Sequence, residues 1–181
     1  QAAAPVELSA EEKARFQAKL DELSGVVGRL KGRPRNLVAD VEIYLKAGVW
    51  LREFPEEFFT ADDVRNAFAV LETGLLRGRQ LLDGASPWMQ QKGRRIHGFY
   101  SELDGSVQLY GMRIPESYDD TNPSRLYVWL HGRDQRNTEV NFITRFQKVS
   151  AGHTNPEELG QLQLDLYGRW NGMAYHWTGE A

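Results

Sequence analysis

The chain has 181 residues, of which 41% are hydrophobic and 26% are charged, and it contains no internal repeat. This length fits one domain, or one domain with an appendage, and the composition supports a packed core rather than a disordered chain. The net charge of −3 argues against a broad nucleic-acid surface, and the absence of cysteine excludes disulfides and thiolate metal sites. No stretch approaches the roughly 20 apolar residues of a membrane span.

The first residues, "QAAAP", contain no initiating methionine, no basic segment and no apolar segment. A mature end left by signal-peptide cleavage has this composition, and so does a trimmed chain. We favour the first interpretation, which predicts a secreted or periplasmic protein.

Residues 1–90 are predicted to form a helical N-terminal region. Ser9 with Glu12, and Thr60 with Asp63, have the spacing of capping boxes at helix starts. Between them, "GRPR" and Pro55 interrupt the helical pattern. Three apolar stripes recur at helical spacing, at Phe16, Leu20, Leu23 and Val27, at Leu37, Val41, Tyr44, Leu45 and Val49, and at Val64, Phe68, Leu71, Leu75 and Leu82. An isolated helical hairpin cannot bury all three stripes, so one is expected to face the second half or another chain.

From residue 94 the pattern changes to the period of two that strands show. "RIHGFYS" and "SVQLYGMRIP" flank Asp104-Gly105, which predicts an antiparallel hairpin. "RLYVWL" reads as a buried strand covered on both faces, residues 136–149 as a helix, and "LGQLQLDLYG" as a further strand. A strand, a helix and a second strand predict parallel pairing, so residues 91–181 belong to the α/β class.

The segments "GFYSELDGSVQLYGMRIPESYD", "RLYVWLHGR", "LDLYGRWNGMAYHWTGEA" and "ADVEIYLKAGVWLREF" resemble secreted bacterial α/β-hydrolases of the esterase and prolyl-oligopeptidase-like type. The resemblance covers most of residues 35–181. It implies an α/β fold in which a helical N-terminal region precedes the first strands of a mostly parallel, incomplete hydrolase sheet. It also implies hydrolysis of an ester or a peptide-like bond in a small-molecule substrate.

In such hydrolases the loop after the "HG" strand supplies a backbone N–H of the oxyanion hole. The resemblance assigns this role to His131, Gly132 and Arg133, with the N–H of Arg133 as the expected donor. A structural alternative for His131 is that its side chain only hydrogen-bonds the backbone to hold the loop. Arg133 and Asp134 stand where many esterases have further glycines, which leaves the donor open.

The nucleophile elbow G-x-S-x-G is absent from the sequence. Ser86 and Ser106 lack its second glycine, and Ser106 follows a hairpin turn. By the family's order of residues, the nucleophile, the acid and the catalytic histidine are expected outside this chain. The expected partner is then the remaining C-terminal part of the same hydrolase, or a second copy, because an incomplete sheet exposes an apolar edge.

The aromatic stretch "YGRWNGMAYHW" is the second candidate site. Substrate binding is predicted for Arg169, Trp170, Tyr175, His176 and Trp177, because open α/β sheets bind ligands beyond the carboxyl ends of their strands. The alternatives are that these rings cover the sheet or pack on the helical region, and that Arg169 pairs with Glu180. The rival function is a non-catalytic binding or assembly module that uses the loop 167–177. No histidine pair has the spacing of a helical metal motif, so neither a metal nor another cofactor is expected.

Overall fold

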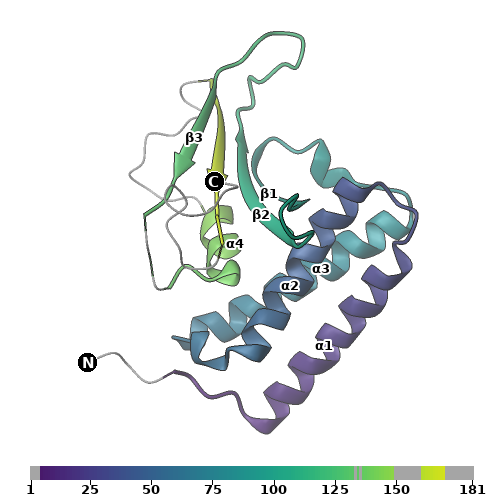
Figure 1. Cartoon of the computed structure of the whole chain (residues 1–181), viewed down its shortest axis with the longest axis vertical. Coiled ribbons are helices and arrows are strands. Elements are labelled where there is room, and N and C mark those ends of the chain that lie inside the picture. The colour runs from purple at the N-terminus through teal and green to yellow at the C-terminus, as the bar shows by residue number, and fades with distance from the viewer. Residues whose placement is uncertain (1–4, 133, 135, 149–159, 170–181) are drawn as a thin grey trace.

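A computed structural model describes residues 5–132, 134, 136–148 and 160–169 (Figure 1). Its elements in chain order are α1 (Ala10–Arg29), α2 (Arg35–Glu53), a 3-10 turn (Pro55–Glu57), α3 (Ala61–Leu82), a 3-10 turn (Pro87–Met89), β1 (Gly93–Tyr100), β2 (Val107–Ile114), β3 (Leu126–Leu130), α4 (Glu139–Gln147) and β4 (Leu162–Leu166). Among the described residues, no helix combines the length and the apolar character needed to cross a bilayer.

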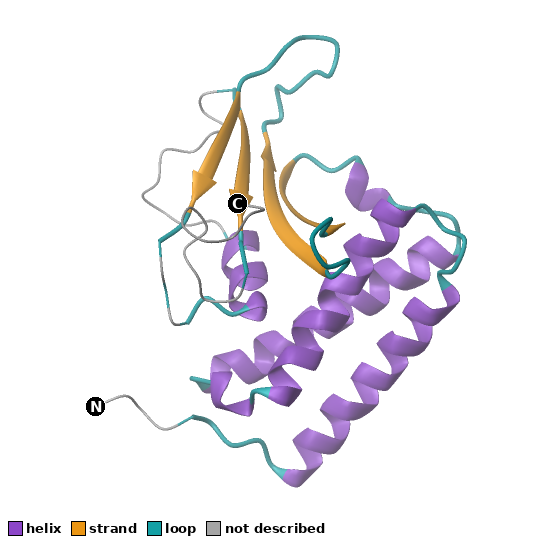
Figure 2. Ribbon diagram, viewed as in Figure 1, coloured by secondary structure: helices purple, strands orange, loops and turns teal. Residues whose placement is uncertain are grey.

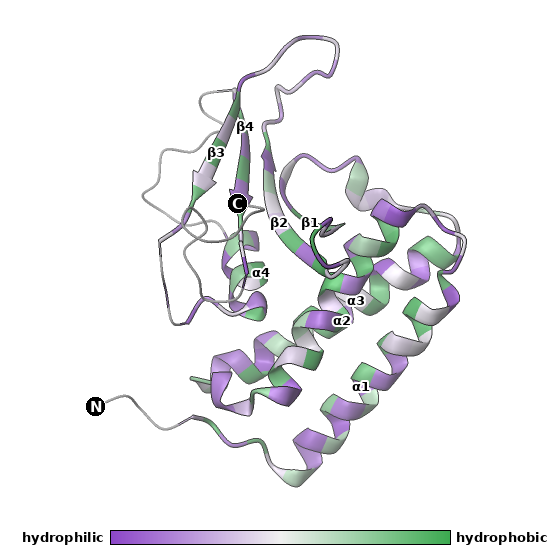
Figure 3. Cartoon of the chain, viewed as in Figure 1, coloured by the Kyte–Doolittle hydropathy of each residue, from purple (hydrophilic) through white to green (hydrophobic). Residues whose placement is uncertain are grey.

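The first three helices form where the sequence predicts them. Both capping boxes are present: Ser9 accepts from the N–H of Glu12, and Thr60 accepts from the N–H of Asp63. Each helix carries both hydrophobic and hydrophilic residues (green and purple in Figure 3). The predicted stripe of α3 is rotated from the observed one, since its buried face includes Ala67, Val70, Leu71, Gly74, Leu75, Gly78 and Leu81. Val64 and Phe68 are only half-buried at the edge of that face.

The middle helix, α2, joins the helical region to the sheet. It packs against α1 and α3 and also contacts β1 and β2. One hydrophobic core therefore runs from the helices into the sheet, with Leu20 of α1, Tyr44 of α2, Leu75 of α3, Ile96 of β1 and Leu109 of β2 all buried within it. The expectation that one helical stripe faces the second half is confirmed.

A cluster of buried polar groups around Asp40 joins α2 to the sheet. The carboxylate of Asp40 is 2% exposed and accepts from Trp88 Nε1 at 2.7 Å and from the backbone N–H of Gly98 at 2.7 Å. The Nδ1 atom of His97 lies 3.0 Å from the same carboxylate. Groups that follow Asp40 by 48, 57 and 58 residues in the sequence thus converge on its side chain.

The guanidinium of Arg77 completes this cluster from α3. It donates to the carbonyl of Ile96 at 2.8 Å and lies over the rings of Tyr44 and Trp88, 5.2 and 5.1 Å from their centroids. A buried cation is tolerated there because both a carbonyl oxygen and two aromatic faces stabilise its charge.

The described strands form one sheet in the order β1-β2-β4-β3. β1 and β2 pair as the predicted antiparallel hairpin, and β3 and β4 pair in parallel, with Leu126 opposite Leu162 and Leu130 opposite Leu166. The prediction of a mostly parallel sheet is wrong, because β2 also pairs antiparallel with β4. A tight hairpin forces its two strands to be antiparallel, and its placement beside β4 makes the sheet mixed.

The strand β3 lies at the edge of the sheet opposite the helices (Figure 2). Its five residues, Leu126 to Leu130, are each between 41% and 49% exposed. The expectation that both faces of this strand are covered is therefore wrong. An apolar sequence indicates that a strand is suited to burial, but it does not indicate whether another element of the fold packs against it.

The backbone of α2 approaches β1 closely at Gly98, and this contact yields a stability prediction. A Cβ atom at Gly98 would lie 2.3 Å from the backbone oxygen of Ala39. Because backbone atoms cannot yield as a flexible side chain does, we expect Gly98→Ala to lower the free energy of unfolding by about 2–3 kcal/mol. Urea unfolding followed by circular dichroism measures the change.

The matched control is Gly25→Ala on the exposed side of α1. No atom lies within 4 Å of a Cβ at this position, and the helix is continuous through it. Alanine here is expected to raise the free energy of unfolding by about 0.5–1 kcal/mol, since glycine in a helix interior costs conformational entropy. Equal effects of the two substitutions would contradict the close packing of α2 on β1.

Candidate functional site

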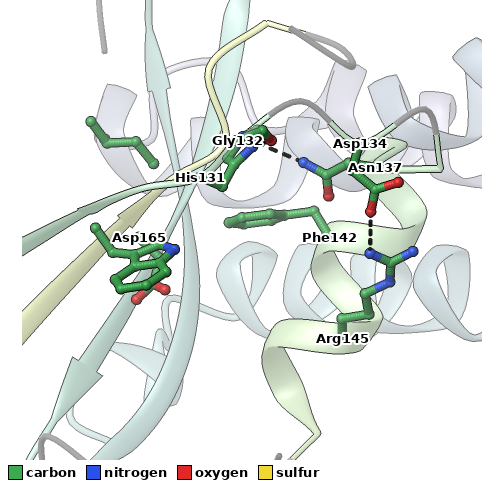
Figure 4. A pocket seen from close by; sticks show the side chains of 9 residues that line it. His131, Gly132, Asp134, Asn137, Phe142, Arg145 and Asp165 are labelled. Carbon is green, nitrogen blue, oxygen red and sulfur yellow. Dashed lines mark hydrogen bonds and ion pairs between the residues drawn. The ribbon is translucent and has the colours of Figure 1, made fainter. Parts of the chain in front are cut away.

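A pocket opens where the parallel strands β3 and β4 end (Figure 4). It holds about 160 Å³, and the residues that line it come from the two strand ends, the loop after β3 and α4. These residues are Trp129, His131, Gly132, Asp134, Asn137, Phe142, Arg145, Asp165 and Leu166. The carboxyl ends of parallel strands are the usual place for ligands in open α/β sheets, so the predicted loop lies at the expected edge.

The side chain of His131 bridges the ends of the two strands. Its Nε2 atom lies 2.6 Å from the carbonyl oxygen of Tyr167, just beyond β4, and its Nδ1 atom lies 2.7 Å from the carbonyl oxygen of Gly132. The amide of Asn137 lies 3.4 Å from Nε2. Both ring nitrogens of His131 thus lie against backbone carbonyl oxygens, as expected for the loop-holding role that the sequence left as an alternative.

Gly132 follows His131 in the loop. None of the described residues packs so closely against it that only glycine would fit. No described atom lies within 4 Å of a Cβ at this position, and its backbone is not in the left-handed region. The space beside Gly132 thus opens into the pocket rather than onto a neighbouring element. This arrangement suits a loop that a ligand approaches closely.

Charged groups line the far side of the pocket. Asp134 accepts from Arg145 Nη1 at 2.8 Å, and this hydrogen bond, followed by one from the backbone N–H of Arg136, lowers the pKa of Asp134. Asp165 on β4 is buried, which raises its pKa, and it pairs with Arg113 at 3.2 Å. The pocket therefore combines an exposed ion pair with a buried carboxylate, and both carboxylates are already hydrogen-bonded to arginines.

The predicted site residues are only partly placed. His131 and Gly132 line the pocket, whereas Arg133, Trp170, Tyr175, His176 and Trp177 lie outside the described residues. Arg169 donates to Asp104 at 2.7 Å and to Ser101 Oγ at 2.8 Å, so it ties the end of β4 to the β1–β2 turn.

Tyr167 belongs to the predicted aromatic loop, but it is fully buried. It packs against Phe142, with ring centroids 5.2 Å apart, and donates to the carbonyl of Asn137 at 3.0 Å. This ring is therefore part of the hydrophobic core beside α4.

Sequence reasoning did not identify Asn137 or Arg145 as pocket residues. The available signal was their position between the "HGR" loop and the first two turns of the predicted helix, which places them beside the end of β3. That signal is weak, because most residues at helix starts are only solvated.

Neither serine that was considered as a nucleophile occupies a strand-to-helix turn. Ser86 precedes the 3-10 turn at Pro87, and Ser106 donates to Asp104 at 2.6 Å within the hairpin connection. In the described part of the chain, no group of three or more histidine and acidic side chains could hold a metal ion. The described site therefore offers a backbone loop and a pocket, without an activated nucleophile.

No family model, no curated protein and no solved structure matches the chain.

Proposed function

We propose that this chain contributes the oxyanion-hole loop of a serine hydrolase that acts on ester or peptide-like bonds. The nucleophile, the acid and the catalytic histidine of that hydrolase lie outside the chain. The observation that supports the proposal is the position of His131 and Gly132: they follow β3 at the carboxyl end of a parallel strand pair, and they border an open pocket.

The chemistry requires little of this loop beyond a fixed backbone N–H. Acyl transfer places negative charge on the substrate oxygen in the transition state, and a donor held at 2.7–3.1 Å stabilises that charge. Gly132 leaves room for the substrate, and the two contacts of His131 link the carbonyl of Gly132 to the backbone just beyond β4. The loop after the glycine would supply the donor, as it does in α/β-hydrolases.

The exposure of β3 supports the proposed partner. An edge strand with apolar side chains and no lysine or proline along Leu126–Leu130 is a template for pairing with another strand. The remaining C-terminal part of the same hydrolase, or a second copy of this chain, would supply that strand and cover both faces.

The same observation favours a second candidate, a non-catalytic assembly module. An exposed apolar edge binds a partner strand whether or not the partner carries a nucleophile. In this case the loop 167–177 and β3 together would form the binding surface, and the pocket at His131 would have no catalytic role.

Labelling with a fluorophosphonate probe separates the two candidates. The 181-residue chain is expected to remain unlabelled, because its sequence lacks a nucleophile elbow and neither Ser86 nor Ser106 occupies a strand-to-helix turn. The natural protein that contains this chain is expected to be labelled at a serine outside these residues. Labelling of Ser86 or Ser106 with one probe per chain would contradict the proposal.

An intact mass of the natural protein supplies the second measurement. A mass well above that of the 181 residues, together with labelling, supports the hydrolase. A mass close to that of the 181 residues, without labelling, supports the assembly module.

A further inference from the structure

A second pocket of about 240 Å³ lies between α2, the β1–β2 turn, the start of α4 and the segment after β4. The residues that matter for its chemistry are Lys46, Trp50, Ser106, Gln108, Glu139 and Arg169. No part of the proposed hydrolase function uses it. Pockets for drug-sized ligands usually hold about 300–1,000 Å³, so this pocket suits a smaller molecule, such as one with a single ring.

One wall of the pocket is a continuous chain of hydrogen bonds. Arg169 donates to Asp104 at 2.7 Å, Ser106 donates to the same carboxylate at 2.6 Å, and the amide of Gln108 donates to Ser106 at 2.7 Å. Lys46 then donates to the amide oxygen of Gln108 at 3.1 Å. Each of these side chains is thereby oriented by its neighbour, which is the preorganisation that a binding site requires.

The chain of hydrogen bonds ends at the carboxylate of Glu139, one oxygen of which lacks a donor among the described residues. Lys46 donates to Oε1 of Glu139 at 2.7 Å, but Oε2 of Glu139 is buried and has no hydrogen-bond partner among the described residues. The whole residue is only 5% exposed. Burying a carboxylate oxygen without a donor is costly, and burial raises the pKa of Glu139 accordingly.

The ammonium group of Lys46 also has an N–H for which the described residues provide no acceptor. An ammonium has three N–H donors, and the described residues accept only two from Lys46, at Gln108 and Glu139. A carboxylate oxygen without a donor and an ammonium group with a remaining N–H thus belong to two paired side chains that line the same pocket.

The ion pairs that line the pocket indicate which charge a ligand should carry to bind there. The charged side chains that line the pocket form two ion pairs, Lys46 with Glu139 and Arg169 with Asp104, and the charge of Glu57 acts on Glu139 from outside the lining. A cationic ligand could donate to Glu139 but would face Lys46, and an anionic ligand could accept from Lys46 but would face Glu139. A hydroxyl group both donates and accepts, so it satisfies both positions whether Glu139 is ionised or protonated.

We propose that this pocket binds a small neutral polyhydroxylated ligand, of the size of a monosaccharide, through adjacent hydroxyls on Glu139 and Lys46. The indole of Trp50, which packs on Phe54 with ring centroids 4.6 Å apart, supplies the flat apolar wall against which the C–H face of a sugar ring packs. Few atoms of such a ligand make contact, so dissociation constants in the millimolar range are expected.

The test is titration of the ¹⁵N-labelled chain with glucose, galactose and mannose, followed by two-dimensional NMR. Saturable shifts are expected at the indole N–H of Trp50 and at the side-chain amide of Gln108. Glu139→Gln, which keeps the shape of the side chain but halves its acceptors, is expected to weaken binding about tenfold or more. Trp50→Leu is a second variant, at a half-buried position where folding is less at risk.

Arg145→Ala is the matched control, because Arg145 lines the other pocket, and it should leave sugar binding unchanged. The spectra of each variant also report whether it is folded. Ethylammonium and acetate serve as charged comparison probes. The proposal is overturned if no hexose gives saturable shifts, if only a charged probe does, or if a folded Glu139→Gln chain binds hexoses as the wild type does.

Discussion

Asp40→Ala is expected to lower the free energy of unfolding by about 3–5 kcal/mol, the cost of removing one partner from a buried hydrogen-bonded charge. The substitution leaves three donors without an acceptor: the indole N–H of Trp88, Nδ1 of His97 and the backbone N–H of Gly98. All three are buried, so water cannot replace the carboxylate without opening the contact between α2 and the sheet. Guanidinium unfolding followed by tryptophan fluorescence measures the loss.

Asp62→Ala supplies the control for removing an aspartate in general. Asp62 pairs with Arg65 at 2.8 Å on the surface of α3, where both side chains are largely exposed. Exposed pairs of this kind contribute about 0–1 kcal/mol. If the two substitutions lowered stability equally, Asp40 would not be the group that joins the helices to the sheet.

The sequence was sufficient to predict the elements that depend on residues close together in the chain. Ser9 with Glu12, and Thr60 with Asp63, are patterns whose hydrogen bonds close within four residues, so they predicted the helix starts. Asp104-Gly105 predicted the hairpin for the same reason, and the pattern of strand, helix and strand predicted the parallel pairing of β3 with β4.

Contacts between distant segments were not predictable in the same way. Asp40 occupies a polar position in an otherwise apolar helix, and nothing nearby indicates that residues 48 and 57 positions later will bind it. The exposure of β3 was missed because its apolar sequence fits a covered strand, and the cover is not encoded in the strand itself.

The two candidate sites also differ in how much of each the sequence alone could predict. His131 and Gly132 directly follow a strand that the sequence predicts, and the resemblance to hydrolases assigned them their role. The pair of Lys46 with Glu139 joins residues 93 positions apart, and each of them alone looks like an ordinary surface residue. Only the fold brings their charges together in a buried place.

In the full-length hydrolase proposed above, Gly132→Val is expected to reduce kcat about 100-fold, while KM changes little. An oxyanion donor acts on the transition state, so its displacement appears in kcat rather than in ground-state binding. The valine side chain would occupy the open space beside Gly132, where a substrate oxygen is expected to approach. Steady-state kinetics on a chromogenic short-chain ester measure both constants.

Two comparisons make the result specific to the loop. No described atom lies near a Cβ at Gly132, so the same substitution in the 181-residue chain is expected to change the free energy of unfolding by less than about 0.5 kcal/mol. His131→Asn is expected to reduce kcat less than Gly132→Val, because the His131 side chain only holds the backbone of the loop. Wild-type turnover in a well-folded Gly132→Val enzyme would mean that the loop after β3 does not approach the reacting oxygen. The pocket at His131 would then be a feature of the sheet edge alone, and the assembly module would be the better account of the exposed strand.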